Sequence, residues 1–221
     1  MPQRTNPWPS FVDLYLAMFV LAFGGLVLMA GRDTSDPAQK LKNKIIASLR
    51  SSLKSSNVHY QDKGCGEDIC FDLYVHFQVD KANLINPDEI EALRSIAENL
   101  KIILDDLDSS KSAVEINIEG HTDSQVPSIN ADAETKFLYN WGLSSRRAFA
   151  VLYKFAQSDL RVPKYKISAI GYADSQRLCN EETEDCYKRN RRVTLRIRID
   201  TKKIEEWAAS KVRLVEGTQA R

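Results

Sequence analysis

The stretch ICFDLYVHFQVD, residues 69–80, alternates between side chains of two kinds. Its large apolar members are Phe71, Leu73, Val75, Phe77 and Val79. They fall on one face, which predicts a β-strand with one buried side. The segment NPDEIEALRSIAENLKIILDDL that follows, residues 86–107, changes to a helical period and opens with the helix-start pair Asn86 and Pro87. This change from strand to helix indicates an α/β domain.

The rest of the chain continues the same pattern. Further strands are predicted at AVEINIEG (113–120), YKISAIGY (165–172) and RRVTLRIRID (191–200). Further helices are predicted at SSRRAFAVLYKFAQ (144–157), with Ser144 as the N-cap, and at KKIEEWAASKV (202–212). We expect an α/β (α+β) domain of two layers, in which helices cover one face of a mixed four-stranded sheet.

The N-terminal region has a different composition. Residues 10–31 read SFVDLYLAMFVLAFGGLVLMAG, and Asp13 is the only charged side chain among them before Arg32. About 20 residues at ~1.5 Å each cross a ~30 Å hydrocarbon core. The main alternative is a signal peptide, which needs a basic start and a small-residue cleavage site. Arg4 is the only basic residue ahead of the run. We therefore expect an uncleaved transmembrane helix.

A narrow apolar stripe follows the proposed span. Leu41, Ile45, Leu49 and Leu53 recur at four-residue intervals on a basic helix. The stripe could pack on a second copy, on the membrane surface, on another subunit or on its own domain. The expected organisation is a cytoplasmic tail (1–10), a transmembrane helix (11–31), a linker with this amphipathic helix (32–60) and a folded domain (61–221).

Charge and histidine content exclude some functions. With 31 basic and 30 acidic residues the net charge is +1, which argues against nucleic-acid binding through a broad basic field. The three histidines, His59, His76 and His121, do not accompany a nucleophile in any recognisable catalytic arrangement. We expect no enzyme activity, no cofactor and no metal.

The four cysteines form two close pairs, Cys65 with Cys70 and Cys179 with Cys186. Of the three connectivities, we prefer the two local disulfides, and four free thiols are the alternative. The spacers do not match a zinc site. Disulfides would place residues 32–221 outside the inner membrane. The basic residues after the span (Arg32, Lys40, Lys42, Lys44 and Arg50) favour the opposite orientation under the positive-inside rule.

Three motifs stand out: EGHTDS at 119–124, NWGLSSRRA at 140–148 and NRRV at 190–193, with Gly171 and Tyr172 before the last. In this order they resemble the OmpA-like peptidoglycan-binding domain, and the resemblance covers about residues 69–200. Two departures are a longer segment between Asp123 and Asn140 and the cysteines that flank the loop before Asn190.

The resemblance implies that Asp123 and Arg147 bind the diaminopimelate side chain of a wall stem peptide. A zwitterionic end needs an acid for its ammonium and a guanidinium for its carboxylate. The first turn after Ser144 would also attract an anion at Arg147. The remaining expected binding residues are Thr122, Tyr139, Asn140, Leu143 and Arg191. The alternative is a purely structural Asp123–Arg147 ion pair. Arg191 and Arg192 are neighbours on a strand, so at least one of them should be structural.

The N-terminal segment, taken together with the domain that follows it, resembles another group. A short tail with Trp8, an early intramembrane Asp13 and one span before an OmpA-like domain resemble the B subunit of ion-driven stators, the MotB group. The resemblance implies that Asp13 carries the ion, although a residue near the headgroups could merely favour the helix dipole. It also implies a multi-span A subunit and a second copy of this chain as partners.

The same resemblance implies an inner-membrane protein whose N-terminus is cytoplasmic and whose C-terminal domain is periplasmic. Within the group, YNWGLSSRR (139–147) and the compact linker resemble the wall-anchored motor subunits of the Zorya antiphage defence system. The alternatives are a flagellar-type MotB subunit, a passive tether between membrane and wall, and a cell-envelope signalling or assembly factor with the same anchor. The helix at 39–55 could serve as a dimer clasp or as a plug.

Overall fold

The computed structural model describes residues 15–16, 18–19, 36–55, 58–77, 81–125, 132–160 and 164–219. The chain divides into two compact units, Met1–Asp36 and Pro37–Arg221. In the first unit residues 15–16 and 18–19 are helical and Asp36 is not. Asp13 and nearly all of the expected span at 11–31 lie outside the described residues. Among the residues that are described, no helix is both long enough and apolar enough to cross a membrane.

The second unit is built on one five-stranded sheet with the order β1-β2-β5-β3-β4. The strands are β1 (His59–Cys65), β2 (Asp68–Tyr74), β3 (Val114–Gly120), β4 (Lys166–Gly171) and β5 (Val193–Ile199). Only β3 and β4 are parallel to each other, and the other neighbours are antiparallel. The α/β class and the mixed sheet are confirmed, but the predicted number of four strands is wrong.

The additional strand is β1, at the edge of the sheet. It pairs with β2 through a tight turn at Gly66, whose φ of 72° suits glycine. Its sequence, HYQDKGC, is polar and has no alternating buried face, because an edge strand needs only one hydrogen-bonded neighbour. The Cys65–Cys70 disulfide joins the two strands beside this turn.

The predicted strand at 69–80 is shorter and more buried than expected. β2 ends at Tyr74, and Phe77 forms only an isolated bridge with Leu84. Asp72, on the face expected to meet solvent, is fully buried. It accepts a hydrogen bond from the Thr194 hydroxyl at 2.5 Å, and its other oxygen lies 3.3 Å from Nε of buried Arg192. These partners explain why a carboxylate can occupy the middle of the sheet.

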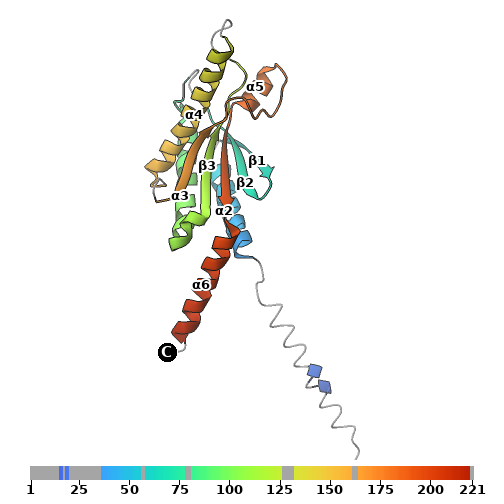
Figure 1. Cartoon of the computed structure of the whole chain (residues 1–221), viewed down its shortest axis with the longest axis vertical. Coiled ribbons are helices and arrows are strands. Elements are labelled where there is room, and N and C mark those ends of the chain that lie inside the picture. Colours follow the sequence, from blue (N-terminus) through green and yellow to red (C-terminus); the bar gives the residue numbers. More distant parts are fainter. Residues whose placement is uncertain are drawn as a thin grey trace, which may run out of the picture. The chain divides into compact units, whose positions relative to one another are not determined.

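Helices cover one face of this sheet (Figure 1). They are α2 (Pro37–Lys54), α3 (Pro87–Asp105) and α4 (Ala133–Gln157), with a short 3-10 turn at Asp108–Ala113. The last helix, α6 (Thr201–Gln219), follows β5 and extends away from the end of the sheet (Figure 1). The side chain of Asn86 caps α3 by accepting a hydrogen bond from the backbone N–H of Asp88, as predicted. Ile204 of α6 is buried and Trp207 packs against the core, so the expected closing helix is also confirmed.

The apolar stripe of α2 packs inside its own unit. Leu41, Ile45, Leu49 and Leu53 are all buried in the main core, and α2 lies against α3. Of the four surfaces on which the stripe could have packed, the structure shows the domain itself. In the described unit the stripe is therefore not available to a second copy or to a membrane surface.

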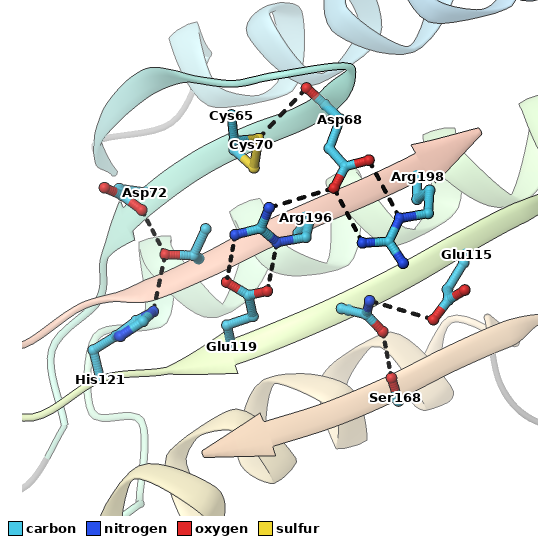
Figure 2. A network of polar contacts seen from close by, with 12 residues as sticks. Cys65, Asp68, Cys70, Asp72, Glu115, Glu119, His121, Ser168, Arg196 and Arg198 are labelled. Atoms are coloured by element: carbon cyan, nitrogen blue, oxygen red, sulfur yellow. Dashed lines mark hydrogen bonds and ion pairs between the residues drawn. A yellow bond between two sulfur atoms is a disulfide. The ribbon is translucent and has the colours of Figure 1, made fainter. Parts of the chain in front are cut away.

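The opposite face of the sheet carries polar and charged side chains (Figure 2). Arg196 on β5 donates to Glu119 on β3 at 2.6 Å and lies 3.3 Å from Asp68. Arg198 contacts the same Asp68 at 3.4 Å. Because side chains alternate along each strand, the residues between these charges face the helices and form the core.

The second helix of the motif region begins earlier than predicted. α4 starts at Ala133, and Asp132 caps it by accepting a hydrogen bond from the backbone N–H of Thr135 at 2.7 Å. Ser144 is therefore in the middle of the helix and not at its start. Its hydroxyl donates to the carbonyl of Trp141, which is a bond that serine commonly forms inside helices.

Two glycines let α4 lie directly on the sheet. A Cβ at Gly120, the last residue of β3, would lie 2.1 Å from the carbonyl oxygen of Ser144. A Cβ at Gly171, the last residue of β4, would lie 2.2 Å from Oγ of Ser145. Because β3 and β4 are parallel, both close contacts occur at the same end of the sheet, where these two strands finish. They bring the middle of α4 over the loops that leave these strands.

Candidate functional site

A cleft of about 1140 Å³ opens at the end of the sheet where β3 and β4 finish. Its walls include every residue that the motifs assigned to binding: Thr122, Asp123, Tyr139, Asn140, Leu143, Arg147 and Arg191. The cleft is bordered by the loop after β3, by the middle of α4 and by α5 (Glu184–Asn190), among other segments. Figure 1 shows α5 beside the end of the sheet, apart from the other helices.

Backbone hydrogen bonds fix the loop after β3. The N–H of His121 donates to the carbonyl of Arg192 at 3.0 Å, and the N–H of Thr122 donates to the carbonyl of Ala173 at 2.8 Å. The Ser144 hydroxyl in turn accepts the N–H of Ala173 at 3.0 Å. The motifs seen in the sequence are therefore joined to one another at the strand ends, which holds Thr122 and Asp123 in the cleft.

The ion-pair partner of Asp123 is Arg191 rather than Arg147. Nη1 of Arg191 lies 2.5 Å from Oδ2 of Asp123, and the N–H of Gln125 donates to Oδ1 at 3.0 Å. The expected structural alternative, an Asp123–Arg147 pair, is not the arrangement in the structure. Both carboxylate oxygens of Asp123 have protein donors, and a carboxylate has further lone pairs for a ligand.

Arg147 is largely buried, with 8% of its surface exposed. Its Nε donates to the carbonyl of Lys81 at 3.3 Å, and its guanidinium lies 5.1 Å from the ring centre of Phe77. Because α4 begins at Ala133, Arg147 does not lie in a first helical turn. The prediction that free backbone N–H groups attract an anion at Arg147 is therefore wrong, and any anion must be bound by the Arg147 side chain.

Two buried oxygen atoms in the cleft have no hydrogen-bond partner among the described residues. They are Oγ1 of Thr122 and Oδ1 of Asn140, in side chains that are 3% and 5% exposed. Buried polar atoms are almost always satisfied, and leaving one unpaired costs about 1–3 kcal/mol. Both residues line the same cleft as Asp123 and Arg147, so a ligand with polar groups can supply their missing partners.

Arg192 has a structural place. It is 2% exposed, pairs with buried Asp72 and donates from Nη2 to the carbonyl of Gln176 at 3.1 Å. Arg191 extends instead toward Asp123 and is about one third exposed. Both arginines border the cleft, but Arg192 is buried with Asp72, whereas Arg191 is partly exposed and pairs with Asp123.

His121 borders the cleft as a neutral imidazole. Burial, followed by the positive charges of Arg192, Lys63 and Arg196, lowers the pKa of His121 from 6.5 to about 3. Its ring stacks on Tyr172 at 5.6 Å, and Nε2 lies 3.3 Å from the Thr194 hydroxyl. The same hydroxyl donates to Asp72, so it links His121 to that carboxylate. The histidine supports the loop and has no nucleophile beside it among these contacts.

The sequence did not indicate many of the other residues that line the cleft. They include His59, Gln61, Tyr74, His76, Phe77, Lys136, Asp185, Lys188 and Arg189. Several belong to β1 and α5, which are polar or short and carry no clear period. A usable signal existed for α5, because Thr183 followed by Glu184 and Asp185 is a helix start, and Thr183 does cap it.

Both predicted local disulfides form, Cys65–Cys70 and Cys179–Cys186, and no described cysteine is free. Among the described residues one trio has the spacing of metal ligands: Cys179, Glu181 and Cys186. Its two sulfur atoms are joined to each other, so this trio does not offer thiolates to a metal.

Comparison with known proteins places this fold in a family. The OmpA family matches residues 76–191. The uncharacterized protein YtxE of Bacillus subtilis strain 168 is 34% identical over 84 residues, which are 38% of this chain and 32% of that protein. The chain therefore matches only about a third of the length of that relative.

Solved structures show the same fold. The periplasmic domain of Helicobacter pylori MotB (residues 78–256) has a TM-score of 0.50 at 18% identity, covering 73% of this chain and 92% of that one. A MotB-like protein from Desulfovibrio vulgaris has a TM-score of 0.53 at 21% identity, covering 73% and 94%. The cell wall anchor of the T6SS from Pseudomonas aeruginosa has a TM-score of 0.50 at 19% identity, covering 70% and 96%.

At these identities the solved structures establish the fold alone. The family match is more informative, because it spans more than half of the 221 residues and contains the cleft residues from Thr122 to Arg191. The chain belongs to the OmpA family, a non-catalytic family of peptidoglycan-binding domains.

Proposed function

We propose that the cleft binds the diaminopimelate end of a peptidoglycan stem peptide. Asp123 accepts hydrogen bonds from the ammonium group of the ligand, and Arg147 donates hydrogen bonds to the carboxylate of the ligand. The observation that carries this proposal is the pair of buried, unpartnered oxygens on Thr122 and Asn140, in the same cleft as an acid and a guanidinium. A zwitterionic ligand end has donors for those oxygens and both charges for the ionic side chains.

The energetics favour a buried zwitterion here. Hydrogen bonds to charged groups contribute about 1.5–3 kcal/mol each, and an arginine can bind a carboxylate through two parallel N–H groups. Arg147 is largely buried against Phe77, which keeps its guanidinium out of bulk water. Tyr139 and Leu143 form apolar parts of the wall. Together these side chains provide shape as well as charge.

A titration with purified muropeptides tests the site. In the full-length chain, Asp123→Ala and Arg147→Ala should each weaken binding at least about tenfold, because each leaves one ligand charge without its partner. Arg146→Ala is the matched control, since Arg146 is the adjacent arginine on α4 and its side chain is exposed. Unchanged affinity in both cleft variants would remove the assignment.

In the whole chain, this domain anchors the B subunit of an ion-driven stator to the wall. Support comes from the apolar run at 11–31 with its single acid, Asp13, ahead of a wall-binding domain. Asp13 carries the ion, the partner is a multi-span A subunit, and two copies of this chain assemble in the complex. The MotB fold is found in a domain described as periplasmic, and two disulfides also suit that compartment.

We propose further that this stator complex is a motor of the Zorya antiphage type and that the chain is its ZorB-like subunit. The YNWGLSSRR motif at 139–147 and the short distance between the apolar run and the domain support this choice. A flagellar-type MotB subunit and a passive membrane-to-wall tether are the alternatives. The tether differs from both motors because it gives Asp13 no ionic role.

A further inference from the structure

Arg191 bridges two carboxylates. Its Nη1 lies 2.5 Å from Asp123, and its Nη2 lies 2.5 Å from Glu184, the first residue of α5. Asp123 is 9% exposed at its side chain, whereas Glu184 is 59% exposed. The trio carries two negative charges and one positive charge. Glu184 therefore compensates Arg191 and leaves Asp123 able to attract a cation.

The position of Arg191 depends on a closed loop. The Cys179–Cys186 disulfide joins the segment before α5 to α5 itself, and Cys186 is buried. The Asn190 side chain accepts the N–H of Leu178 at 2.8 Å and donates to the carbonyl of Cys179 at 3.0 Å. The N–H of Arg191 then donates to the carbonyl of Tyr187 at 3.0 Å, so its backbone is tied to α5.

We propose that Arg191 is a positioning residue for Asp123, held in place by the Cys179–Cys186 loop. The inference rests on the proposed function and gives Arg191 a role other than direct ligand contact. With Gln125 on one oxygen and Arg191 on the other, the Asp123 carboxylate has a fixed plane. Its remaining lone pairs are then directed at one place in the cleft, where the ligand ammonium binds.

The chain contains a matched control for this loop. The Cys65–Cys70 disulfide is also local, with a sequence separation of 5 against 7 for Cys179–Cys186. It lies beside the β1–β2 turn, and neither of its cysteines lines the cleft. Removal of either disulfide should lower stability, but only the Cys179–Cys186 loop is connected to Asp123 through Arg191.

The experiment compares two ligands on the full-length chain. One is a disaccharide-tripeptide that ends in diaminopimelate with a free amine, and the other is the same molecule with that amine acetylated. The wild type should prefer the free amine. Arg191→Gln, Glu184→Gln and C179S/C186S should each reduce this preference about fivefold, whereas C65S/C70S should leave it unchanged. Combining Arg191→Gln with C179S/C186S should add little, because both act on the same contact.

Each result decides the question. Arg191→Gln and Glu184→Gln alter partly exposed side chains, so they remain informative even where a cysteine variant unfolds. A full preference for the free amine in both of them overturns the inference and leaves the proposed function in place. An equal loss in C65S/C70S also overturns it, because general destabilisation then explains the effect. A wild type that binds neither muropeptide overturns the proposed function and this inference with it.

Discussion

At the scale of single residues, the Thr194 hydroxyl lies between two buried titratable groups. It donates to Asp72 at 2.5 Å and lies 3.3 Å from Nε2 of His121. Asp72 in turn pairs with Arg192, and both side chains are 1% exposed. Removing one member of a buried ion pair costs about 3–5 kcal/mol, because the other charge stays uncompensated. These residues lie directly beneath the loop that carries Asp123.

His121 should make the stability of the fold depend on pH. The unfolded chain protonates this histidine near pH 6.5, whereas the folded chain does so only near pH 3. Between these values the unfolded state binds more protons, so the free energy of unfolding falls as the pH decreases. The contribution of neutral His121 is complete above pH 6.5. From pH 7.5 to pH 5 the expected loss is about 2 kcal/mol.

Urea unfolding of the wild type and of His121→Gln at the two pH values measures this loss. Carboxylates contribute to the pH dependence of both proteins, so the difference between the two slopes isolates the histidine. The wild type should lose more stability than the variant on acidification. Equal slopes would show that His121 has the same pKa in the folded and unfolded states, which contradicts the lowered pKa.

At the scale of elements, the site depends on how closely α4 approaches β3 and β4. Gly120 and Gly171 have no side chain between these strands and the helix, and the buried Ser144 hydroxyl joins the helix to the N–H of Ala173. A small displacement of α4 would move Asn140 and Arg147 away from the loop that holds Asp123. The two glycines therefore set the width of the cleft.

Gly120→Ala should destabilise the domain by about 3 kcal/mol, because the new methyl group would meet the backbone oxygen of Ser144 at 2.1 Å. Gly64→Ala on β1 is the matched control, since a Cβ there has nothing within 4 Å. Thermal unfolding of both variants checks the prediction. A Gly120→Ala protein as stable as Gly64→Ala would show that α4 does not lie directly on the strand.

Periodic elements could be predicted from the sequence, and others could not. β3, β5 and α3 each place their large apolar side chains on one face, so alternating or helical spacing reveals them. β1 is stabilised by pairing with β2 and leaves no apolar pattern. The sequence predicts a start of α4 that is too late, because Ser144 resembles an N-cap. In the structure the Ser144 hydroxyl donates to Trp141 and accepts from Ala173 inside the fold.

For the cleft, the motifs identified which residues meet but not how they pair. Asp123 and Arg191 are separated by 68 positions, and the only ion-pair partner that the sequence suggested for Asp123 was Arg147. The choice depends on the Cys179–Cys186 loop, whose conformation no local pattern specifies. Unpartnered oxygens such as Oδ1 of Asn140 are likewise a property of the packed structure.

At the scale of the whole molecule, the proposed motor requires an acid at one end and a wall contact at the other. One elementary charge that moves through the membrane potential releases about 2.3 kcal/mol per 100 mV. A carboxylate can couple to this energy by binding and releasing protons in turn. Wall binding would prevent the subunit from drifting while it does so. α2 belongs to the folded unit, so the connection to the proposed span is confined to residues ahead of Pro37.

Asp13→Asn should abolish the cellular function of the chain, whether this is phage resistance or motility, and leave muropeptide affinity unchanged. The substitution removes the titratable group and keeps the size of the side chain. Asp13→Glu, which retains a carboxylate, should keep part of the activity. Full activity of Asp13→Asn alongside an inactive Arg147→Ala would identify a passive tether instead.

The most direct test of the central claim is a comparison of two muropeptides that differ only in the third residue of the stem peptide. The side chain of diaminopimelate ends in both an ammonium and a carboxylate, whereas the side chain of lysine ends in an ammonium alone. If Asp123 and Arg147 divide these charges between them, isothermal titration should show at least about tenfold tighter binding of the diaminopimelate form, because lysine leaves Arg147 without its anion. Equal affinity for the two muropeptides would contradict the account.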